Sequence, residues 1–397
     1  KRQPLSNRAM NYVYSSNNEV NSNQPSPYTK KSIDYVLSTT KENLNEWVTV
    51  KVNVKEHFKK FHDLDVKELN EIAKIMVAPK KGILAADEST GTIKKRLDTI
   101  NVESTEDNRR NWRQLLFQTK SISDYISGVI LYDETLRQNT SDGISMVDLL
   151  SSKGILPGIK VDKSTHDLAL SKGEVLTEGL DGLRERLSEY RELGAKFTKW
   201  RAVININDNL PTEFAINVNS ILLSIYASLS QEAGLVPIVE PEVLMDGDHS
   251  IEKCAETTEK TLLKVFEDLV EANVHLSGIV LKPNMVLSGK DAQNRASTEE
   301  VAKYTVEVLK NTVPADVPGI AFLSGGQEDQ ESIDNLNSIN IVGAEEKVPW
   351  ELSYSYGRGL QGAPLKIWGG ENSKVSEAQK EFEKRGIAVS LARQGKY

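Results

Sequence analysis

Short apolar segments recur along most of this chain at a regular spacing, and this recurrence limits the folds open to it. The intervals between them, for example Leu183–Tyr190, Asn217–Gln231 and Thr257–Glu271, have amphipathic helical patterns. Eight strands alternating with helices predict an α/β fold, the (β/α)8 TIM barrel with a parallel sheet. The eight segments start 29 to 44 residues apart and are Gly82–Asp87, Ile126–Asp133, Ile155–Asp162, Phe197–Ile204, Val236–Val243, Ser277–Met285, Gly319–Gly326 and Trp350–Gly357.

A doubly wound open sheet is the alternative to the barrel. No G-x-G-x-x-G follows the first segment, which argues against a dinucleotide-binding version of that sheet. The net charge of −8 disfavours a nucleic-acid surface, and no apolar run reaches the about 18 residues that span a membrane. The single cysteine, Cys254, fits a reducing compartment and buried packing, so we expect a cytoplasmic protein without membrane insertion.

The N-terminal part differs in composition from the rest. Residues 1–30 are rich in Asn, Ser and Pro, and residues 31–62 carry mixed helical patterns, such as Lys55–His62, without a clear core. We therefore expect residues 1–62 to be a partly flexible N-terminal extension and residues 63–397 to form the barrel domain. A helix is predicted from Asp65, as N-cap, to Pro79. Among five histidines only His57 and His62 lie close together, so no metal site is expected.

One lysine, Lys282, stands inside the apolar segment Ser277–Met285. A desolvated ammonium has a lowered pKa, and the free amine is a nucleophile that forms a Schiff base with a carbonyl substrate. The alternative is a lysine that extends along the edge of a strand to reach water.

Further charges gather towards the C-terminal ends of the predicted strands. They are Asp87, Lys160 with Asp162, Lys199 with Arg201, and Glu240 with Glu242. Side chains two apart on a strand share a face, so on the inner face these groups would converge at the mouth where barrel enzymes place catalysis. Lys199 would favour a neutral Lys282 by repulsion, Glu240 would transfer protons, and Asp87 would orient a hydroxyl or pair with a lysine. The alternative is a set of structural ion pairs that close the barrel.

Two sets of segments suggest anion binding. Leu323–Gln327 and Ser355–Arg358 follow the seventh and eighth strands, where many barrels bind a phosphate with backbone N–H groups. On the other side, Glu88–Thr92 leads to Lys94, Lys95 and Arg96, which would hold a second phosphate at a helix start. The alternatives are a plain glycine turn and an ordinary N-cap followed by a solvated basic turn.

Together these segments closely resemble class I fructose-1,6-bisphosphate aldolase. The resemblance covers about residues 65–397, in order and without large gaps. It is carried by Lys81–Gly91, Gly158–Lys163, Lys199–Arg201, Val236–Glu242, Leu281–Met285 and Leu323–Gln327. It implies reversible cleavage of fructose 1,6-bisphosphate to dihydroxyacetone phosphate and glyceraldehyde 3-phosphate, in glycolysis and gluconeogenesis. The imine takes the place of a metal, so no cofactor is expected.

The resemblance also implies roles for individual residues. Lys282 would form the Schiff base and Glu240 would be the main proton shuttle, with Asp87, Lys199 and Glu242 assisting. The ketone-side phosphate would be held by Ser324, Gly325 and Arg358, with Ser355 and Gly357 in the same substrate site. The aldehyde-side phosphate or its neighbouring hydroxyls would be held by Ser89, Thr92, Arg96, Lys160 and Arg201. The family has Ser more often at the position of Thr92, which keeps the hydroxyl.

Several expectations follow for partners and for departures from the family. The family forms homotetramers, and it resembles proteins that bind actin filaments or acidic adhesin tails, so both kinds of partner are expected alternatives. The family ends in a mobile tail with a tyrosine that assists enamine protonation, and Tyr397 is not the positional match of that tyrosine. Another Schiff-base barrel aldolase or a transaldolase is the rival enzyme.

Overall fold

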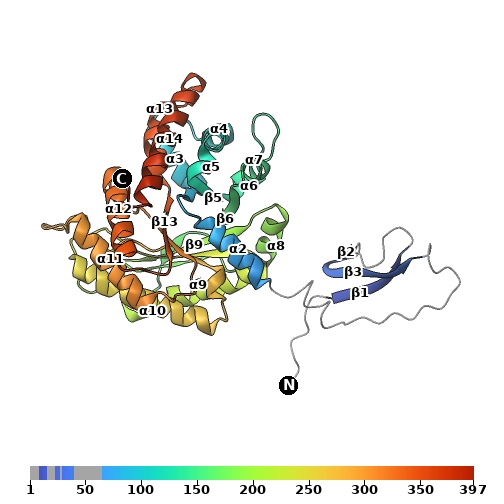
Figure 1. Cartoon of the computed structure of the whole chain (residues 1–397), viewed down its shortest axis with the longest axis horizontal. Helices are drawn as coiled ribbons and strands as arrows, with labels where there is room; N and C mark the ends of the chain where they lie inside the picture. The colour runs from blue at the N-terminus through green and yellow to red at the C-terminus, as the bar shows by residue number, and fades with distance from the viewer. Residues whose placement is uncertain (1–8, 16–22, 27–28, 40–64) are drawn as a thin grey trace. The chain divides into compact units, whose positions relative to one another are not determined.

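The computed structural model describes residues 9–15, 23–26, 29–39 and 65–397 (Figure 1). The chain divides into two compact units, Lys1–Asp65 and Val66–Tyr397. In the first unit, β3 (Thr29–Thr39) pairs in parallel with β1 (Ala9–Ser15) and antiparallel with β2 (Asn23–Ser26).

These three strands correct part of the prediction for the extension. Residues 31–39, where the sequence suggested mixed helical character, lie in the strand Thr29–Thr39, and β1 and β2 lie within the stretch predicted to be flexible. The segment Thr29–Thr39 contains Ile33, Tyr35 and Val36, residue types that favour strands. The predicted helical pattern at Lys55–His62, with both of its histidines, lies outside the described residues.

The second unit is a closed barrel of eight parallel strands, which confirms the predicted (β/α)8 fold and rules out the open sheet. Neighbouring strands follow the chain order, and β13 closes the barrel by pairing with β4. The barrel strands are β4 (Gly82–Ala86), β5 (Ile126–Leu131), β6 (Leu156–Lys160), β9 (Phe197–Ile204), β10 (Val236–Val243), β11 (Val280–Leu281), β12 (Gly319–Phe322) and β13 (Glu351–Tyr356).

Helices surround these strands (Figure 1). Several begin at a Ser or Thr whose side chain accepts a hydrogen bond from the first turn, for example Ser89, Thr212 and Ser250. A small hairpin of β7 (Thr165–Asp167) and β8 (Val175–Thr177) follows β6. The helices are α2 (Val66–Met76), α3 (Thr90–Asp98), α4 (Glu106–Phe117), α5 (Ile122–Tyr125), α6 (Asp133–Arg137), α7 (Met146–Ser152), α8 (Leu183–Glu192), α9 (Glu213–Glu232), α10 (Ile251–Glu271), η1 (Leu276–Gly278), α11 (Thr298–Thr312), α12 (Asp329–Glu345), α13 (Arg358–Trp368), η2 (Asn372–Lys374) and α14 (Val375–Ala392).

The sixth strand is shorter than the sequence predicted. It was expected over Ser277–Met285, but β11 spans only Val280–Leu281, and η1 occupies part of the segment before it. Pro283 has no N–H group to continue the ladder, and the strand ends at Leu281. The Lys282 N–H still donates to the carbonyl of Val239 at 2.8 Å, so this lysine is held beside the middle of β10.

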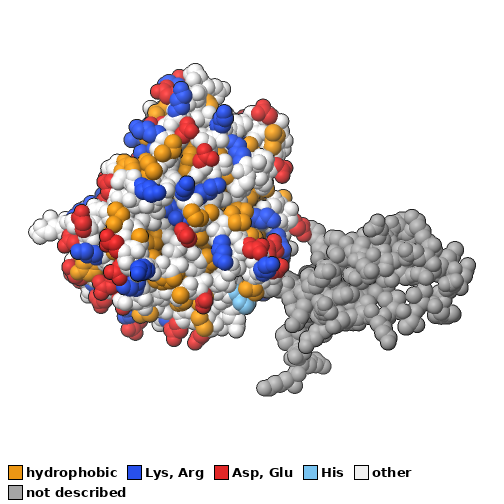
Figure 2. All heavy atoms as spheres, in the orientation of Figure 1, with side chains coloured by type: hydrophobic (Ala, Val, Ile, Leu, Met, Phe, Trp, Pro, Cys, Tyr) orange, Lys and Arg blue, Asp and Glu red, His pale blue; other side chains and the backbone are white. Residues whose placement is uncertain are grey.

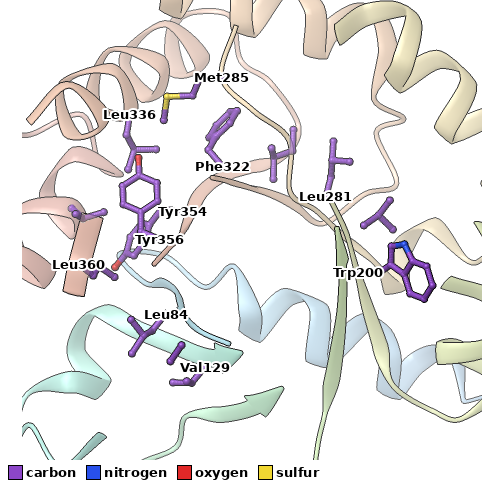
Figure 3. Packing of buried hydrophobic residues seen from close by; sticks show 14 of the residues in the cluster. Leu84, Val129, Trp200, Leu281, Met285, Phe322, Leu336, Tyr354, Tyr356 and Leu360 are labelled. Carbon is purple, nitrogen blue, oxygen red and sulfur yellow. The ribbon is translucent and has the colours of Figure 1, made fainter. Parts of the chain in front are cut away.

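Apolar side chains on the outer face of the barrel pack against the helices. Figure 3 shows Tyr354 and Tyr356 of β13 on the same side as Leu336 of α12 and Leu360 of α13. Trp200 stacks on Tyr226 of α9 with 5.4 Å between ring centroids. Because faces alternate along a strand, the residues between these outward side chains point into the barrel. The inner positions therefore include Lys199 and Ser355.

The surface of this unit mixes both signs of charge with scattered apolar side chains on the face seen in Figure 2. Cys254 is buried on α10, as its helical pattern predicted. Within residues 9–15, 23–26, 29–39 and 65–397, no helix is long and apolar enough to cross a membrane.

Candidate active site

Four charged side chains of alternating sign form a continuous series at the C-terminal ends of the strands. Lys282 Nζ lies 3.1 Å from Glu240 Oε1, and Glu240 Oε2 lies 3.2 Å from Lys199 Nζ. Lys199 Nζ in turn lies 3.2 Å from Asp87 Oδ2. The four side chains are at most 13% exposed, so little water screens these contacts. The structure thus brings together four residues that the sequence placed on four different strands.

Two more ion pairs adjoin this series, one between residues two apart in sequence and one between the neighbouring strands β9 and β10. Lys160 Nζ lies 2.5 Å from Asp162 Oδ1, and Asp162 Oδ2 is 4.0 Å from Lys199 Nζ. Arg201 forms an ion pair with Glu242, and the Glu242 side chain is buried. Every charge that the sequence predicted at the strand ends therefore has an opposite charge beside it.

Burial and neighbouring charges set the pKa values of two of these groups. Burial raises the pKa of Asp87, but Lys199, Lys282 and Lys160 outweigh that effect and lower the pKa to about 2. Burial lowers the pKa of Lys199, but Asp87, Glu240 and Asp162 outweigh it and raise the pKa above its ordinary value. Both groups are consequently charged at neutral pH.

Lys282 combines two surroundings that the sequence suggested. The prediction treated this residue as a lysine within an apolar strand, with Glu240 converging on the same mouth to transfer protons. The side chain is buried, with 5% of its surface exposed, and the Glu240 carboxylate lies beside it. The structure therefore combines a proton acceptor at hydrogen-bond distance with the desolvation that was expected.

A cavity of about 230 Å³ opens above this series of charges. It brings together most of the predicted site residues, and Asp87, Lys199, Ser89, Thr92 and Lys160 are not among those that line it. Asp87 and Lys199 instead lie behind Glu240. The lining residues are Ala85, Arg96, Arg201, Glu240, Glu242, Lys282, Leu323, Ser324, Gly325, Gly326, Ser355, Gly357 and Arg358.

The loops after β12 and β13 form one wall of the cavity. A Cβ atom at Gly325 would lie 2.6 Å from Glu242 Oε1, so only glycine fits there without a shift. The Ser355 hydroxyl is buried without a hydrogen-bond partner in the described structure. Arg358, the first residue of α13, donates through Nη2 to the carbonyl of Gln327 at 3.1 Å. A helix start, an unpartnered hydroxyl and an arginine on one wall favour an anionic ligand.

The second predicted phosphate segment has two parts in the structure. Ser89 caps α3 by accepting from the Thr92 N–H at 3.4 Å, and the two hydroxyls lie 3.1 Å apart. This is the ordinary N-cap that the sequence left as an alternative, and both side chains keep donors at the helix start. Arg96, further along α3, instead lies beside the loop after β13, because its Nη2 atom would be 3.9 Å from a Cβ at Gly357. Arg96 therefore adjoins the predicted ketone-side residues.

Some residues that organise the site were not predicted. Asn284 accepts from the Val243 N–H at 3.1 Å and donates to Thr258 Oγ1 at 3.1 Å, which fixes the end of β10. Its position directly after Lys282 and Pro283 was the available signal. Glu88 and Gln361 contact each other at 3.0 Å beneath the cavity wall, and no spacing in the sequence links them.

Metal ligands do not cluster in the described parts of the chain. No group of three or more His, Cys, Asp or Glu side chains there has the geometry to hold a metal ion. The carboxylates at and behind the cavity, Asp87, Glu240 and Glu242, instead form ion pairs with lysines and an arginine.

Comparisons with known proteins agree with this geometry. The family model described as "Fructose-bisphosphate aldolase class-I" matches residues 68–397, and a model described as "Protein of unknown function (DUF3047)" matches residues 1–79. A probable fructose-bisphosphate aldolase class 1 of Xanthomonas campestris is 52% identical over 335 residues, which cover 84% of this chain and 99% of that protein. The cytosolic fructose-bisphosphate aldolase 4 of Arabidopsis thaliana is 52% identical, covering 83% of this chain and 84% of that protein.

Among solved structures, one that this chain resembles is fructose-bisphosphate aldolase from Plasmodium falciparum, a ternary complex with TRAP and a small molecule inhibitor. The TM-score is 0.82 and the sequence identity is 48%, over 83% of this chain and 95% of that chain. The family model covers most of the chain, and the relatives match nearly their whole length. The chain therefore belongs to the class I fructose-bisphosphate aldolases, a family of lyases.

Proposed function

We propose that this chain cleaves and forms fructose 1,6-bisphosphate through an imine between Lys282 and the ketone carbon of the substrate. The observation that carries the proposal is the position of Lys282. It lines the cavity and lies 3.1 Å from a carboxylate that a second lysine holds in place.

Imine formation begins when Glu240 takes a proton from Lys282 and the free amine attacks C2 of the sugar. The same carboxyl group passes this proton to the C2 oxygen and then transfers a second proton from the nitrogen to that oxygen, which leaves as water as the cationic C2–N double bond forms. Because Glu240 Oε2 contacts Lys199, this carboxylate is oriented while its other oxygen faces Lys282. Glu240 therefore acts as the proton shuttle.

Cleavage uses the cationic imine as an electron sink. A carboxylate takes the proton of the C4 hydroxyl, the C3–C4 bond breaks, and glyceraldehyde 3-phosphate leaves. The electron pair moves to C3 as an enamine, which takes a proton, and water then hydrolyses the imine to release dihydroxyacetone phosphate. Glu240 is the carboxylate in our proposal because it lines the cavity, whereas Asp87 does not.

The remaining charges hold this machinery in place. Lys199 is charged at neutral pH. It contacts both Glu240 and Asp87 and compensates the negative charge between them. Glu242 fixes Arg201 at the cavity wall through their ion pair. We assign positioning roles to Asp87, Lys199 and Glu242 on this basis.

Two groups of residues would hold the two phosphates. The ketone-side phosphate would lie against Ser324, Gly325, Ser355, Gly357 and Arg358, which line one wall. The aldehyde-side phosphate would take Ser89, Thr92, Lys160 and Arg201, which offer hydroxyl, ammonium and guanidinium donors.

Borohydride trapping with substrate, followed by peptide mass analysis, tests the imine. The expected result is one adduct on Lys282, with neither adduct nor cleavage in Lys282→Met. Lys153→Met is the control, because burial lowers the pKa of Lys153, which donates to the Thr119 carbonyl at 2.9 Å and does not line the cavity. Full cleavage activity in Lys282→Met would refute the proposal.

A second candidate function is the binding of a protein partner. The Plasmodium falciparum structure that this chain resembles is a complex with TRAP, which supports proposing a protein partner here as well. Basic residues Arg96, Arg201 and Arg358 at the cavity offer an acidic peptide the charges that it needs. Binding of an acidic tail peptide that fructose 1,6-bisphosphate displaces would support this function, and binding that substrate leaves unchanged would exclude a shared site.

The relatives and the family resemblance also suggest a location and an assembly. We propose a cytosolic location, as the name of the Arabidopsis thaliana relative states for that protein, and a homotetramer, as the family resemblance implies. Light scattering on the purified chain would measure the number of subunits.

A further inference from the structure

We propose that Glu88 is a positioning residue that aims Arg96 at the ketone-side phosphate and ties Arg96 to the helix carrying Arg358. The inference rests on the proposed function, since it presumes that phosphate binds at this wall. Glu88 is separate from the series of charges around Lys282, and the mechanism above gives it no role.

Glu88 is a buried carboxylate held at three points. Its Oε1 atom lies 2.5 Å from Arg96 Nη1 and accepts from Gln361 Nε2 at 3.0 Å. Its backbone carbonyl accepts from Nη2 of Arg113, a fully buried arginine, at 2.7 Å. The side chain is 5% exposed, and Oε2 has no hydrogen-bond partner in the described structure. Because this carboxylate is held in place, its ion pair fixes the direction in which the Arg96 side chain points.

The second partner of Glu88, Gln361, connects it to the helix that starts at Arg358. Gln361 lies on α13, three residues after Arg358. It also donates to the carbonyl of Ala85, which lines the cavity, at 2.7 Å and accepts from Trp112 Nε1 at 3.2 Å. Glu88 therefore joins α3, which carries Arg96, to α13, which carries Arg358.

The position of Arg96 identifies the phosphate it would meet. Arg96 lines the same cavity as Ser324, Gly325 and Arg358, and its Nη2 atom lies close to Gly357. Lys160 and the hydroxyls of Ser89 and Thr92 do not line this cavity. Arg96 thus belongs with the ketone-side group.

The physical effect of Glu88 is preorganisation. An arginine loses considerable rotamer freedom when it binds a phosphate, and a side chain already oriented by an ion pair loses less on binding. Nη1 of Arg96 contacts Glu88, whereas Nη2 lies toward Gly357 at the cavity wall, where it can donate to a phosphate.

Steady-state kinetics of Glu88→Gln on two substrates tests the inference. Fructose 1-phosphate has only the ketone-side phosphate, and fructose 1,6-bisphosphate has both. We expect KM to rise about tenfold for both substrates, equivalent to about 1.4 kcal/mol, with kcat within about twofold. A rise for the bisphosphate alone would overturn the ketone-side assignment. An unchanged or lowered KM for both would overturn the positioning role.

Asp268→Asn is the matched control. Asp268 pairs with Lys264 on α10, and the two side chains are 5% and 28% exposed, the same values as Glu88 and Arg96. Both variants are expected to melt earlier than wild type, but only Glu88→Gln is expected to change KM. Partial restoration of KM in Glu88→Asp would support a role that requires a carboxylate. If Glu88→Gln fails to fold, Gln361→Met provides the same test, with a smaller rise in KM expected.

Failure of this inference differs from failure of the imine proposal. At saturating substrate, Glu88→Gln is expected to give the same borohydride adduct as wild type. Absence of an adduct in wild type would refute the imine whatever Glu88 does. A normal adduct with an unchanged KM in Glu88→Gln would refute only the positioning role.

Discussion

Replacement of Lys199 by methionine is the sharpest test of the electrostatics of this site. Lys199 Nζ has three carboxylates within 4.0 Å, those of Asp87, Glu240 and Asp162, and it is 6% exposed. Removing one partner of a buried ion pair typically costs about 3–5 kcal/mol of unfolding free energy, because the other charge is left uncompensated. We expect Lys199→Met to lose stability in this range at pH 7.

The loss should shrink as the pH falls, and the pKa of Asp87 gives the magnitude. The carboxyl has a pKa of about 2 in the folded protein and 3.8 ordinarily, a difference worth about 2 kcal/mol. A lowered folded-state pKa gives stability that is present above pH 3.8 and is lost as the pH falls toward 2. The variant lacks the strongest cause of this lowering, so wild type and variant should converge between pH 4 and pH 2.

Urea unfolding of both proteins at pH 7, 4 and 3 would measure this convergence. Lys264→Met is the control, because Lys264 pairs with Glu267 and Asp268 on α10 away from the cavity. Its effect should be much smaller than that of Lys199→Met. A Lys199→Met variant as stable as wild type at pH 7 would refute the reasoning, as would a difference that does not depend on pH.

Two further substitutions test other parts of the structure. Gly325→Ala places a Cβ 2.6 Å from Glu242 Oε1, and Glu242 is held by its ion pair with Arg201. We therefore expect KM for fructose 1-phosphate to rise about tenfold or more. An unchanged KM would show that this loop relaxes freely. Arg393→Met removes donors to the carbonyls of Lys81 and Ala78 at 2.6 and 3.0 Å, which tie α14 to the start of β4. We expect a loss of about 3 kcal/mol in urea unfolding with kcat retained, and an equal loss of kcat would contradict a purely structural role.

Strand positions and the inner face of the barrel were predictable because both follow from local rules. Lys199 and Arg201 flank the outward Trp200, so period-two alternation alone placed both charges inside. The three strands of the first unit were missed, because the Asn-, Ser- and Pro-rich composition of residues 1–30 is typical of a flexible segment. The pairing of Glu88 with Gln361 was missed because the two are 273 residues apart.

The structure also distinguishes two lysines whose predicted surroundings were similar. Lys199 and Lys282 were placed on the two strands that flank the strand of Glu240 and Glu242, so both had carboxylates nearby. In the structure, Lys199 lies among three carboxylates and does not line the cavity, whereas Lys282 lines the cavity and contacts Glu240 alone among the ion pairs described. A lysine with a raised pKa and no access to substrate is a poor nucleophile. Under our proposal, the covalent chemistry therefore falls to Lys282, and Lys199 holds the shared Glu240 carboxylate in place.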